Sequence, residues 1–338
     1  MSRPLPLPGS DARLHVGYAP APTLQAQLDD PRVLAVFGFG ADAPGHADPR
    51  FLRVPLRPLQ DEAVVEVWRT AGPVEHGRDG DVAWASDGRL LFGAMEVAEP
   101  DGGDIEAAAR HAYTRIGAFL AGLPACHLLR VWNYMDAITL GEDDEERYRR
   151  FCVGRVSGLG QLDAARLPAA TAIGRCDGQR VLQVYWLAAT GPGTPLENPR
   201  QISAYRYPRQ YGPQPPSFAR AMLPPTGSDM PLLLSGTAAI VGHASQHAGS
   251  IRAQVEETLA NIGVLIGSAR RIRPSLPVAP DAATPLKAYV RHPEDAAEVA
   301  AALDSHLGRQ VPRLLLHAQV CRRELLVEID GAHGVPQV

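Results

Sequence analysis

Short runs of apolar residues and one stretch of helical periodicity make up the first half of the chain. In residues 105–123, apolar side chains recur every three or four positions, which indicates the buried face of a long helix. Compact apolar runs before and after it are typical of strands. We expect these strands at residues 33–39, 51–56, 64–68, 89–95 and 128–134. The first half is therefore predicted to consist of strands, one long helix and a further strand.

Further elements follow residue 142, and those from residue 232 onward repeat the order of the first half. Acidic residues at the start of 143–156 suit the N-terminus of a helix. Apolar runs on either side of Asp177-Gly178 predict a hairpin of residues 172–176 and 181–188. The other elements expected here are strands at 202–207, 232–235, 238–241, 288–291, 314–320 and 324–329 and helices at 251–266 and 293–307.

These elements predict an α+β protein in which helices pack on mixed sheets. Residues 1–30 are rich in proline, and we expect them to form an irregular arm. Residues 31–190 would form an N-terminal α+β half and residues 191–338 a C-terminal half. The two halves share the order of their elements without clear residue-level identity, and the C-terminal half carries the closing strand with Cys321 and Glu328.

Composition excludes several classes of protein. The 338 residues are 45% hydrophobic and 21% charged, as in an ordinary globular protein. The net charge of −4 leaves no basic excess for nucleic-acid binding. Neither an apolar N-terminal leader nor a run of about eighteen apolar residues is present, so we expect no membrane segment and a cytoplasmic location. The four cysteines form no CxxC pair, which argues against a zinc ribbon or a redox motif.

Two motifs invite cofactor or metal readings that the surrounding sequence does not support. The glycine-rich run at residues 38–45 follows an apolar strand, as in dinucleotide sites, but a proline-rich loop follows where a helix is needed. His243 and His247 could share one helix face, yet no third ligand or catalytic glutamate accompanies them. We therefore expect neither an organic cofactor nor a metal.

An aromatic and arginine-rich loop at residues 205–221 is more specific. It contains three tyrosines, three arginines and one phenylalanine among several prolines. It is either an ordered surface loop or a pocket wall. In the second case Tyr205 and Tyr211 would hold an apolar ring, and Arg206 or Arg220 would bind a carboxylate through two hydrogen bonds.

Residues 146–155 offer the same combination of side chains from a second segment. Phe151 and Arg155 are its candidates for substrate binding. The neighbouring arginines at 147 and 150 are equally suited to pair with the acidic residues at 142–146. Arg155 stands beside a glycine in a less charged context, which favours it for a site.

The closing strand contains a carboxylate whose environment decides its role. Along residues 325–330, apolar side chains alternate onto one face, and Glu328 lies on the other with Leu326 and Asp330. A charged carboxylate is costly to bury, so Glu328 either faces water or serves in chemistry. Cys321, taken alone, is a small core residue.

Several of these segments together resemble the chorismatase family. They are RVWNYM at 130–135, RYRRFCVGR at 147–155, the loop at 205–221, SGTAAIVGH at 235–243 and CRRELLVEID at 321–330. Their order matches over residues 30–330. The resemblance implies Rid-like α+β modules in a pseudo-trimeric arrangement, related to the Rid-type imine deaminases.

The resemblance also implies a reaction. Chorismatases remove pyruvate from chorismate without metal or organic cofactor. Glu328 would be the acid that protonates the enolpyruvyl ether, which requires a dry site to raise the pKa of that carboxyl group. Cys321 and Gly236 resemble the branch that forms 3-hydroxybenzoate, and a further branch also forms 4-hydroxybenzoate. These products suit pigment or ubiquinone biosynthesis.

Three alternatives remain open from the sequence. A hydrolytic chorismatase would release a cyclohexadiene diol, a non-catalytic Rid-like module would only bind a carboxylate metabolite, and an imine deaminase would act on another substrate class. A small Rid module builds its sites in a homotrimer, whereas this longer chain supplies more than one module. It is therefore expected either as a monomer or as a homo-oligomer.

Overall fold

The computed structural model describes residues 12–100, 104–123, 125–160 and 163–337. This part of the chain forms three large β-sheets, a two-stranded sheet of β14 (Ile240–Val241) and β15 (Ala244–Ser245), and the helices that cover the large sheets. The first sheet has the order β1 (His15–Pro20), β4 (Val64–Arg69), β2 (Val33–Phe39) and β3 (Phe51–Val54), with helix α1 (Leu24–Asp29). The second has the order β5 (Glu75–Asp79), β6 (Val82–Ser86), β7 (Leu90–Ala98), β10 (Val181–Ala189), β8 (His127–Asp136) and β9 (Ala169–Arg175). The third has the order β11 (Thr194–Leu196), β12 (Ala221–Leu223), β13 (Leu232–Ala238), β18 (Val327–His333), β16 (Leu286–Val290) and β17 (Arg313–His317).

The second and third sheets have one topology. In both, the last strand in sequence lies at the centre, antiparallel to the third and fourth strands, and the fifth strand pairs in parallel with the fourth. The first sheet repeats the last four strands of this pattern. The α+β class with Rid-like modules in a pseudo-trimeric arrangement is thereby confirmed.

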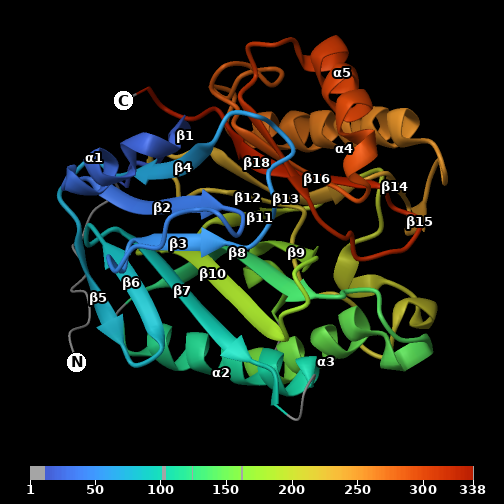
Figure 1. The fold of residues 1–338 in the computed structure, drawn as a ribbon, viewed down its shortest axis with the longest axis horizontal. Helices are drawn as coiled ribbons and strands as arrows, with labels where there is room; N and C mark the ends of the chain where they lie inside the picture. The colour runs from blue at the N-terminus through green and yellow to red at the C-terminus, as the bar shows by residue number, and fades with distance from the viewer. Residues whose placement is uncertain (1–11, 101–103, 124, 161–162, 338) are drawn as a thin grey trace.

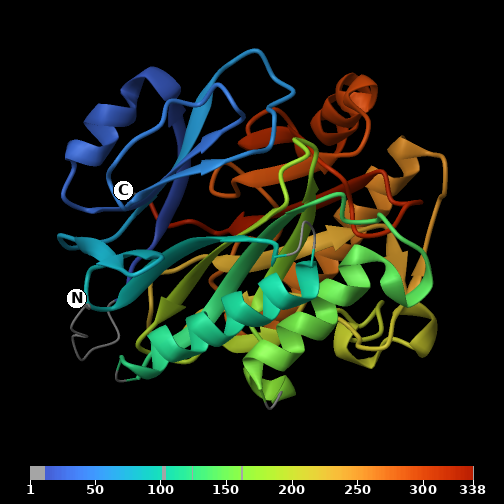
Figure 2. The same ribbon diagram turned by 60° about the horizontal axis from the view of Figure 1, so that its bottom comes forward.

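Helices cover one face of each large sheet and leave the other face for the centre of the molecule. Helix α2 (Ile105–Ala121) packs on the second sheet with α3 (Arg147–Leu159) beside it, as Figure 2 shows. Helices α4 (Ile251–Ile272) and α5 (Ala296–Leu307) pack on the third sheet. The opposite faces of all three sheets meet in a shared apolar core.

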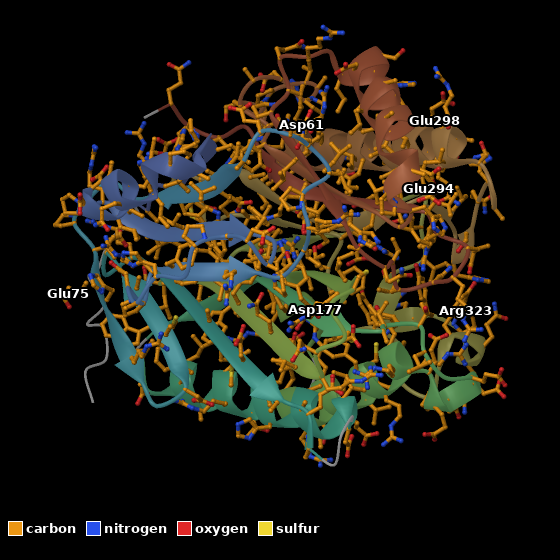
Figure 3. All side chains as sticks on the ribbon, in the orientation of Figure 1. Asp61, Glu75, Asp177, Glu294, Glu298 and Arg323 are labelled. Carbon is orange, nitrogen blue, oxygen red and sulfur yellow. The ribbon has the colours of Figure 1, made fainter. Side chains whose placement is uncertain are left out.

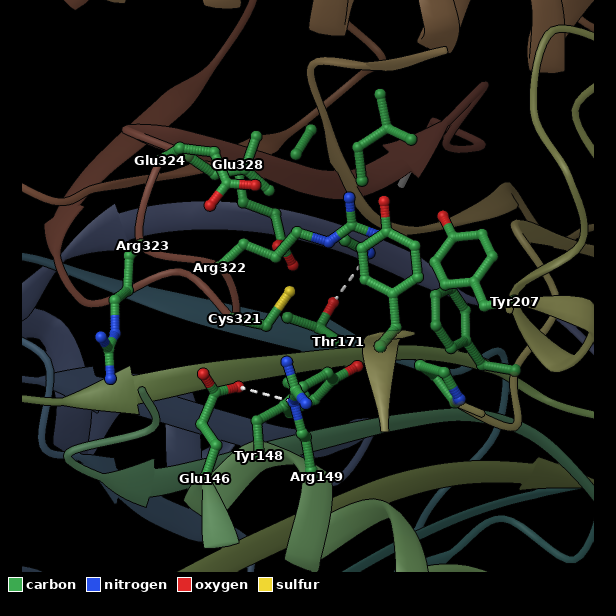
Figure 4. A pocket seen from close by; sticks show the side chains of 18 of the residues that line it. Glu146, Tyr148, Arg149, Thr171, Tyr207, Cys321, Arg322, Arg323, Glu324 and Glu328 are labelled. Carbon is green, nitrogen blue, oxygen red and sulfur yellow. Dashed lines mark hydrogen bonds and ion pairs between the residues drawn. The ribbon is translucent and has the colours of Figure 1, made fainter. Parts of the chain in front are cut away.

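Buried charged residues join the first and third sheets at this core. Lys287 Nζ on β16 lies 2.9 Å from Glu66 Oε2 on β4, and both side chains are 4% exposed. Lys287 Nζ is also 3.9 Å from Asp330 Oδ1 on β18. By contrast, the charged residues labelled in Figure 3 are all exposed to solvent, where most charged side chains lie: Asp61, Glu75, Asp177, Glu294, Glu298 and Arg323.

Corresponding strands also align residue by residue. Phe37 pairs with Glu66 in the first sheet, Tyr134 with Gln183 in the second, and Tyr289 with Glu328 in the third. Glu66, Gln183 and Glu328 therefore occupy one repeated position. In the described part of the chain, Glu66 has an ion-pair partner and Gln183 is uncharged, whereas Glu328 has a carboxyl group with no ion pair.

Three local predictions were wrong. The expected hairpin does not form, because β10 inserts between β7 and β8 while β9 pairs in parallel with β8. Residues 202–207 have no partner strand and contain a 3-10 turn at Ala204–Arg206. Residues 1–30 are not wholly irregular, because β1 and α1 occupy part of them; residues 1–11 lie outside the described residues.

The predicted division into two halves also placed the first and second sheets in a single half. The first sheet is short and lacks a helix between β2 and β3, so its pattern did not stand out in the sequence. Residues 190–193, near the expected boundary at 190, connect the second sheet to the third. Within the described ranges, no helix is long and apolar enough to cross a membrane.

Candidate functional site

A cavity of about 560 Å³ opens between the second and third sheets. Side chains of α3 and β9 form one wall, and β13, β18 and the segment before β18 form the other. The loop at 207–220 contributes aromatic residues and an arginine. The polar and aromatic side chains around it include Glu146, Tyr148, Arg149, Arg155, Thr171, Tyr207, Tyr211, Phe218, Arg220, Cys321, Arg322 and Glu328.

Most of the candidates chosen from the sequence meet at this cavity. Those that line it are Arg155, Tyr211, Arg220, Gly236, Cys321 and Glu328. They come from α3, the aromatic loop and the third sheet, so residues up to about half the chain apart converge on one place. Three other candidates do not line the cavity.

Tyr205, Arg206 and Phe151 lie elsewhere for identifiable reasons. The 3-10 turn at Ala204–Arg206 leaves Arg206 exposed, with its guanidinium 5.7 Å from the ring of Tyr205. Phe151 is 1% exposed within the apolar core of α2 and α3. Its ring stacks on Tyr148, which itself lines the cavity, so Phe151 supports the wall from behind.

Glu328 is the carboxyl group of the cavity with the most perturbed environment. It is 5% exposed, and within the described residues it accepts no hydrogen bond and forms no ion pair. Burial, followed by the negative charge of Asp330, raises its pKa to about 8, against the lowering effect of Arg130 and Arg220. Glu328 is therefore mostly protonated at neutral pH and can donate a proton into the cavity.

Asp330 holds the neighbouring negative charge in a fully buried network. Its Oδ2 atom accepts hydrogen bonds from Arg130 Nη2 at 3.1 Å, Trp132 Nε1 at 2.9 Å, Thr171 Oγ1 at 2.7 Å and Tyr289 Oη at 2.9 Å. These donors come from both the second and third sheets. These four donors hold the Asp330 carboxylate in place beside Glu328.

Gly236 makes room for Glu328. The pairing of β13 with β18 shifts register between Leu234 and Thr237, as in a β-bulge. A Cβ atom at position 236 would stand 1.9 Å from Glu328 Oε1, so a side chain there would displace the carboxyl group. The absence of a side chain at this position is thus a geometric requirement of the site.

Arg155 presents a buried guanidinium with unused donors. It is 3% exposed, and its Nε and Nη2 atoms have no hydrogen-bond partner in the described structure. Its guanidinium lies 5.0 Å from the Tyr113 ring. Gly154 and Gly158 let α3 approach α2 closely, because a Cβ at either would meet an α2 backbone oxygen at 2.1 or 2.6 Å. Buried free donors of this kind suit an anionic ligand.

Arg220 provides the second cationic group. It is 4% exposed, its Nη2 donates to Ile202 O and to the Tyr207 hydroxyl at 2.7 Å, and its Nε has no partner within the described residues. The rings of Phe218 and Tyr207 lie 5.2 and 5.5 Å from its guanidinium. The cavity therefore combines two buried arginines, aromatic rings and the protonated carboxyl group of Glu328.

Cys321 is half-buried between Glu328 and α3 residues. Burial, followed by the negative charge of Glu328, raises the pKa of its thiol above the usual range. The thiol is therefore neutral and a poor nucleophile. It packs against apolar residues of two clusters, so its contribution here is to the shape of the cavity.

Several lining residues were missed from the sequence. Arg322 lies 4.1 Å over the Tyr211 ring and 5.3 Å over the Tyr207 ring, and it donates to His243 O. It closes one side of the aromatic loop. Its position directly after Cys321 was a usable signal. Thr171 gave none, because it stands directly before the predicted hairpin strand at 172–176 and in no recognised motif.

Histidines and other metal-ligating groups are not clustered. Among the described residues, no group of three or more His, Cys, Asp or Glu could hold a metal ion. His243 Nδ1 lies 3.1 Å from the Tyr211 hydroxyl, and His247 Nε2 lies 3.3 Å from Glu257. Each has its own partner, and they do not converge.

Comparison with known proteins gives consistent relatives. A family model described as chorismatase FkbO/Hyg5-like, N-terminal, matches residues 66–188. A chorismatase of Streptomyces rapamycinicus is 40% identical over 280 residues, which are 80% of this chain and 83% of the relative. A 3-hydroxybenzoate synthase of Streptomyces hygroscopicus is 34% identical over 280 residues, 80% of this chain and 81% of that one. A chorismatase crystal structure is 33% identical, with a TM-score of 0.82, and covers 97% of this chain and 99% of its own.

Proposed function

This chain belongs to the chorismatase family, and from that premise we propose that it converts chorismate into 3-hydroxybenzoate and pyruvate. The observation that carries the proposal is Glu328, a buried carboxyl group with a pKa of about 8 that faces a cavity with two buried arginines. The relatives supply the substrate class, and the cavity supplies groups that fit it.

Chorismate has features that these side chains can recognise. It carries one carboxylate on its ring and another on its enolpyruvyl ether. The unused donors of Arg155 and Arg220 provide binding partners for two carboxylates. The rings of Tyr207, Tyr211 and Phe218 offer apolar surface to the cyclohexadiene ring.

Glu328 begins the proposed reaction as general acid. Its proton is transferred to the terminal methylene carbon of the enol ether, which gives an oxocarbenium ion. Cleavage of the bond between the ring carbon and the ether oxygen then releases pyruvate and leaves that ring carbon electron-deficient. The oxygen of the neighbouring 4-hydroxyl bonds to this carbon, and its bond to its original ring carbon breaks, so the hydroxyl moves to the carbon that the ether left. Loss of a ring proton completes aromatisation and restores the protonated acid. Substrate and products contain the same atoms, so no water, metal or redox cofactor is required.

Cys321 and Gly236 would control which nucleophile reaches the intermediate. A neutral thiol fills space beside Glu328, and the bare Gly236 leaves the carboxyl group in place. We propose that this shape excludes water and favours attack by the substrate's own hydroxyl. Formation of some 4-hydroxybenzoate is compatible with the same site.

A single chain supplies α3, the second and third sheets and the aromatic loop around the cavity, which supports a site that one protomer can form. We therefore expect a monomer to be active, which light scattering of the active fraction would test. A homo-oligomer would then add no residue to this site. The cytoplasmic location stays a prediction.

The purified protein should be incubated with chorismate in a chelating buffer, and the products resolved by chromatography. Pyruvate with an equal amount of 3-hydroxybenzoate is the expected result, and any 4-isomer would reveal a dual-product enzyme. Pyruvate with a diol would overturn the proposed role of Cys321 and Gly236, and no pyruvate would overturn the function. Cys321→Ala should divert product toward the diol; an unchanged ratio would contradict its steering role.

A further inference from the structure

One hydroxyl group in the cavity wall has no part in the chemistry above. Thr171, on β9, is 1% exposed and lines the cavity between the second and third sheets. Its Oγ1 atom donates to Asp330 Oδ2 at 2.7 Å and accepts from Arg130 Nη2 at 2.5 Å. It also accepts from the backbone N–H of Gly236 at 3.0 Å. One donor and two acceptor sites are all that a hydroxyl has, so its orientation is fixed.

Two of these contacts reach groups that determine the state of Glu328. Asp330, two residues along β18, supplies the negative charge that adds to the effect of burial on Glu328. Gly236 forms the bulge whose bare Cα leaves room for the Glu328 carboxyl group. Both groups belong to the third sheet, and Thr171 contacts both from the second sheet.

We propose that Thr171 is a positioning residue: its hydroxyl holds the Asp330 carboxylate and the Gly236 bulge in place, and thereby keeps Glu328 protonated and aligned with the substrate. The inference rests on the proposed function, because it assigns a support to the acid of that reaction. Thr171 acts through its neighbours and need not touch the reacting atoms.

Other charged and titratable groups also face Glu328. They are Asp330 on its own strand, Arg130 from β8, Arg220 directly before β12, Tyr148 from α3 and Cys321 from the segment before β18. Among these, Thr171 bonds to Asp330 and Arg130 together. Loss of the hydroxyl removes one of the four contacts that hold the Asp330 carboxylate beside Glu328, so that the carboxylate can move away from Glu328. The pKa of Glu328 should then fall.

Thr171→Val keeps the shape of the side chain and removes the hydroxyl, whereas Thr171→Ser keeps the hydroxyl. For the valine variant, we expect kcat to fall about 10- to 100-fold with KM changed by less than about threefold, as for a misplaced catalytic group. The alkaline limb of its kcat profile should also move to lower pH. The serine variant should show the wild-type kcat and the wild-type position of the alkaline limb.

A thermal melt of each variant, recorded together with its pH profile of kcat, shows whether the variant is folded. A folded valine variant with the wild-type kcat and limb would overturn the proposal, and so would a serine variant damaged as severely as valine. If the valine variant fails to fold, Tyr289→Phe tests the proposal in its place. This change removes another donor to Asp330 and leaves Gly236 untouched. Its limb should move in the same direction, and an unchanged limb would overturn the proposal. An inactive wild-type protein would instead overturn the proposed function.

Discussion

Gly236 and Glu328 face each other across two paired strands so closely that no side chain fits between them. A Cβ atom built on Gly236 lies 1.9 Å from Glu328 Oε1 and 2.9 Å from its carboxyl carbon. The two residues come from β13 and β18, about ninety positions apart in the chain. The position of the acid therefore depends on a residue that carries no functional group.

Gly236→Ala should reduce activity by displacing the acid. The added methyl group must push the Glu328 carboxyl group aside, and misplacement by about 1 Å can cost about 100-fold in rate. The kcat for pyruvate release from chorismate measures the effect. Gly263→Ala is the matched control, because a Cβ at this helix position meets nothing within 4 Å. Equal activity of the two variants would contradict the close contact.

The rate should depend on a single group that must be protonated. Because the pKa of Glu328 is raised to about 8, the donating form is lost as pH rises through that value. We expect kcat to be level below about pH 7 and to fall about tenfold per pH unit well above 8. Glu328→Gln, which cannot donate, should lose about 10²- to 10⁴-fold at every pH. A rate that rises between pH 7 and 9 would exclude Glu328 as the acid.

The same raised pKa predicts a cost in stability at high pH. The carboxyl group binds its proton more tightly in the folded protein than in the unfolded chain, whose value is 4.5. Its contribution is therefore fully present below pH 4.5 and is lost as pH rises through about 8. Each pKa unit corresponds to about 1.4 kcal/mol, so Glu328→Gln should be more stable than wild type at pH 9 by a few kcal/mol at most. Urea unfolding of both proteins at pH 6 and pH 9 tests this; a gap that does not widen with pH would contradict it.

Local sequence patterns predicted much of the fold. The seven-residue apolar run of β2 and the helical repeat of α2 were found at nearly their observed positions. The hairpin was wrong because turn residues at Asp177-Gly178 say only that the chain turns. Strand pairing depends on the whole sheet, in which β10 occupies the central position between β7 and β8.

The candidate site was predictable where side chains share a motif and invisible where they meet only in three dimensions. Glu328, Cys321 and Arg220 stand in short segments that combine charged residues with apolar or aromatic ones, which made them visible in the sequence. Thr171 is a single threonine in the apolar strand β9, and its role arises from contacts with Asp330 and Gly236 on another sheet. Arg206 is the opposite case. Its motif predicted a site residue, but the 3-10 turn at Ala204–Arg206 directs its side chain to solvent.

Arg155→Gln should weaken substrate binding, and Arg206→Gln should not. Arg155 is buried with free donors at the cavity, so its loss removes a charge-assisted contact with a carboxylate. Such contacts contribute about 1.5–3 kcal/mol, which corresponds to a roughly 10- to 150-fold fall in kcat/KM. Arg206 is exposed outside the cavity and serves as the matched control. Steady-state kinetics of both variants provides the comparison, and an equal loss would refute the assignment of Arg155.

Lys287→Met should destabilise the whole molecule, because it leaves the buried Glu66 carboxylate without its partner. Burial by itself would lower the pKa of Lys287, but Glu66 and Asp330 outweigh it and raise the value, so the ammonium is charged at neutral pH. Removal of one member of a buried pair costs about 3–5 kcal/mol. Urea unfolding measures the loss, and Arg252→Gln, which breaks an exposed pair with Glu256 on α4, should cost no more than about 0.5 kcal/mol.

The double variant Lys287→Met with Glu66→Gln should recover part of the loss, since no buried charge is then left unpaired at position 66. If the double variant is less stable than Lys287→Met alone, the ion pair does not account for the effect, and the contact of the Lys287 ammonium with the Trp132 ring, 5.2 Å from Nζ to the ring centroid, would be its source.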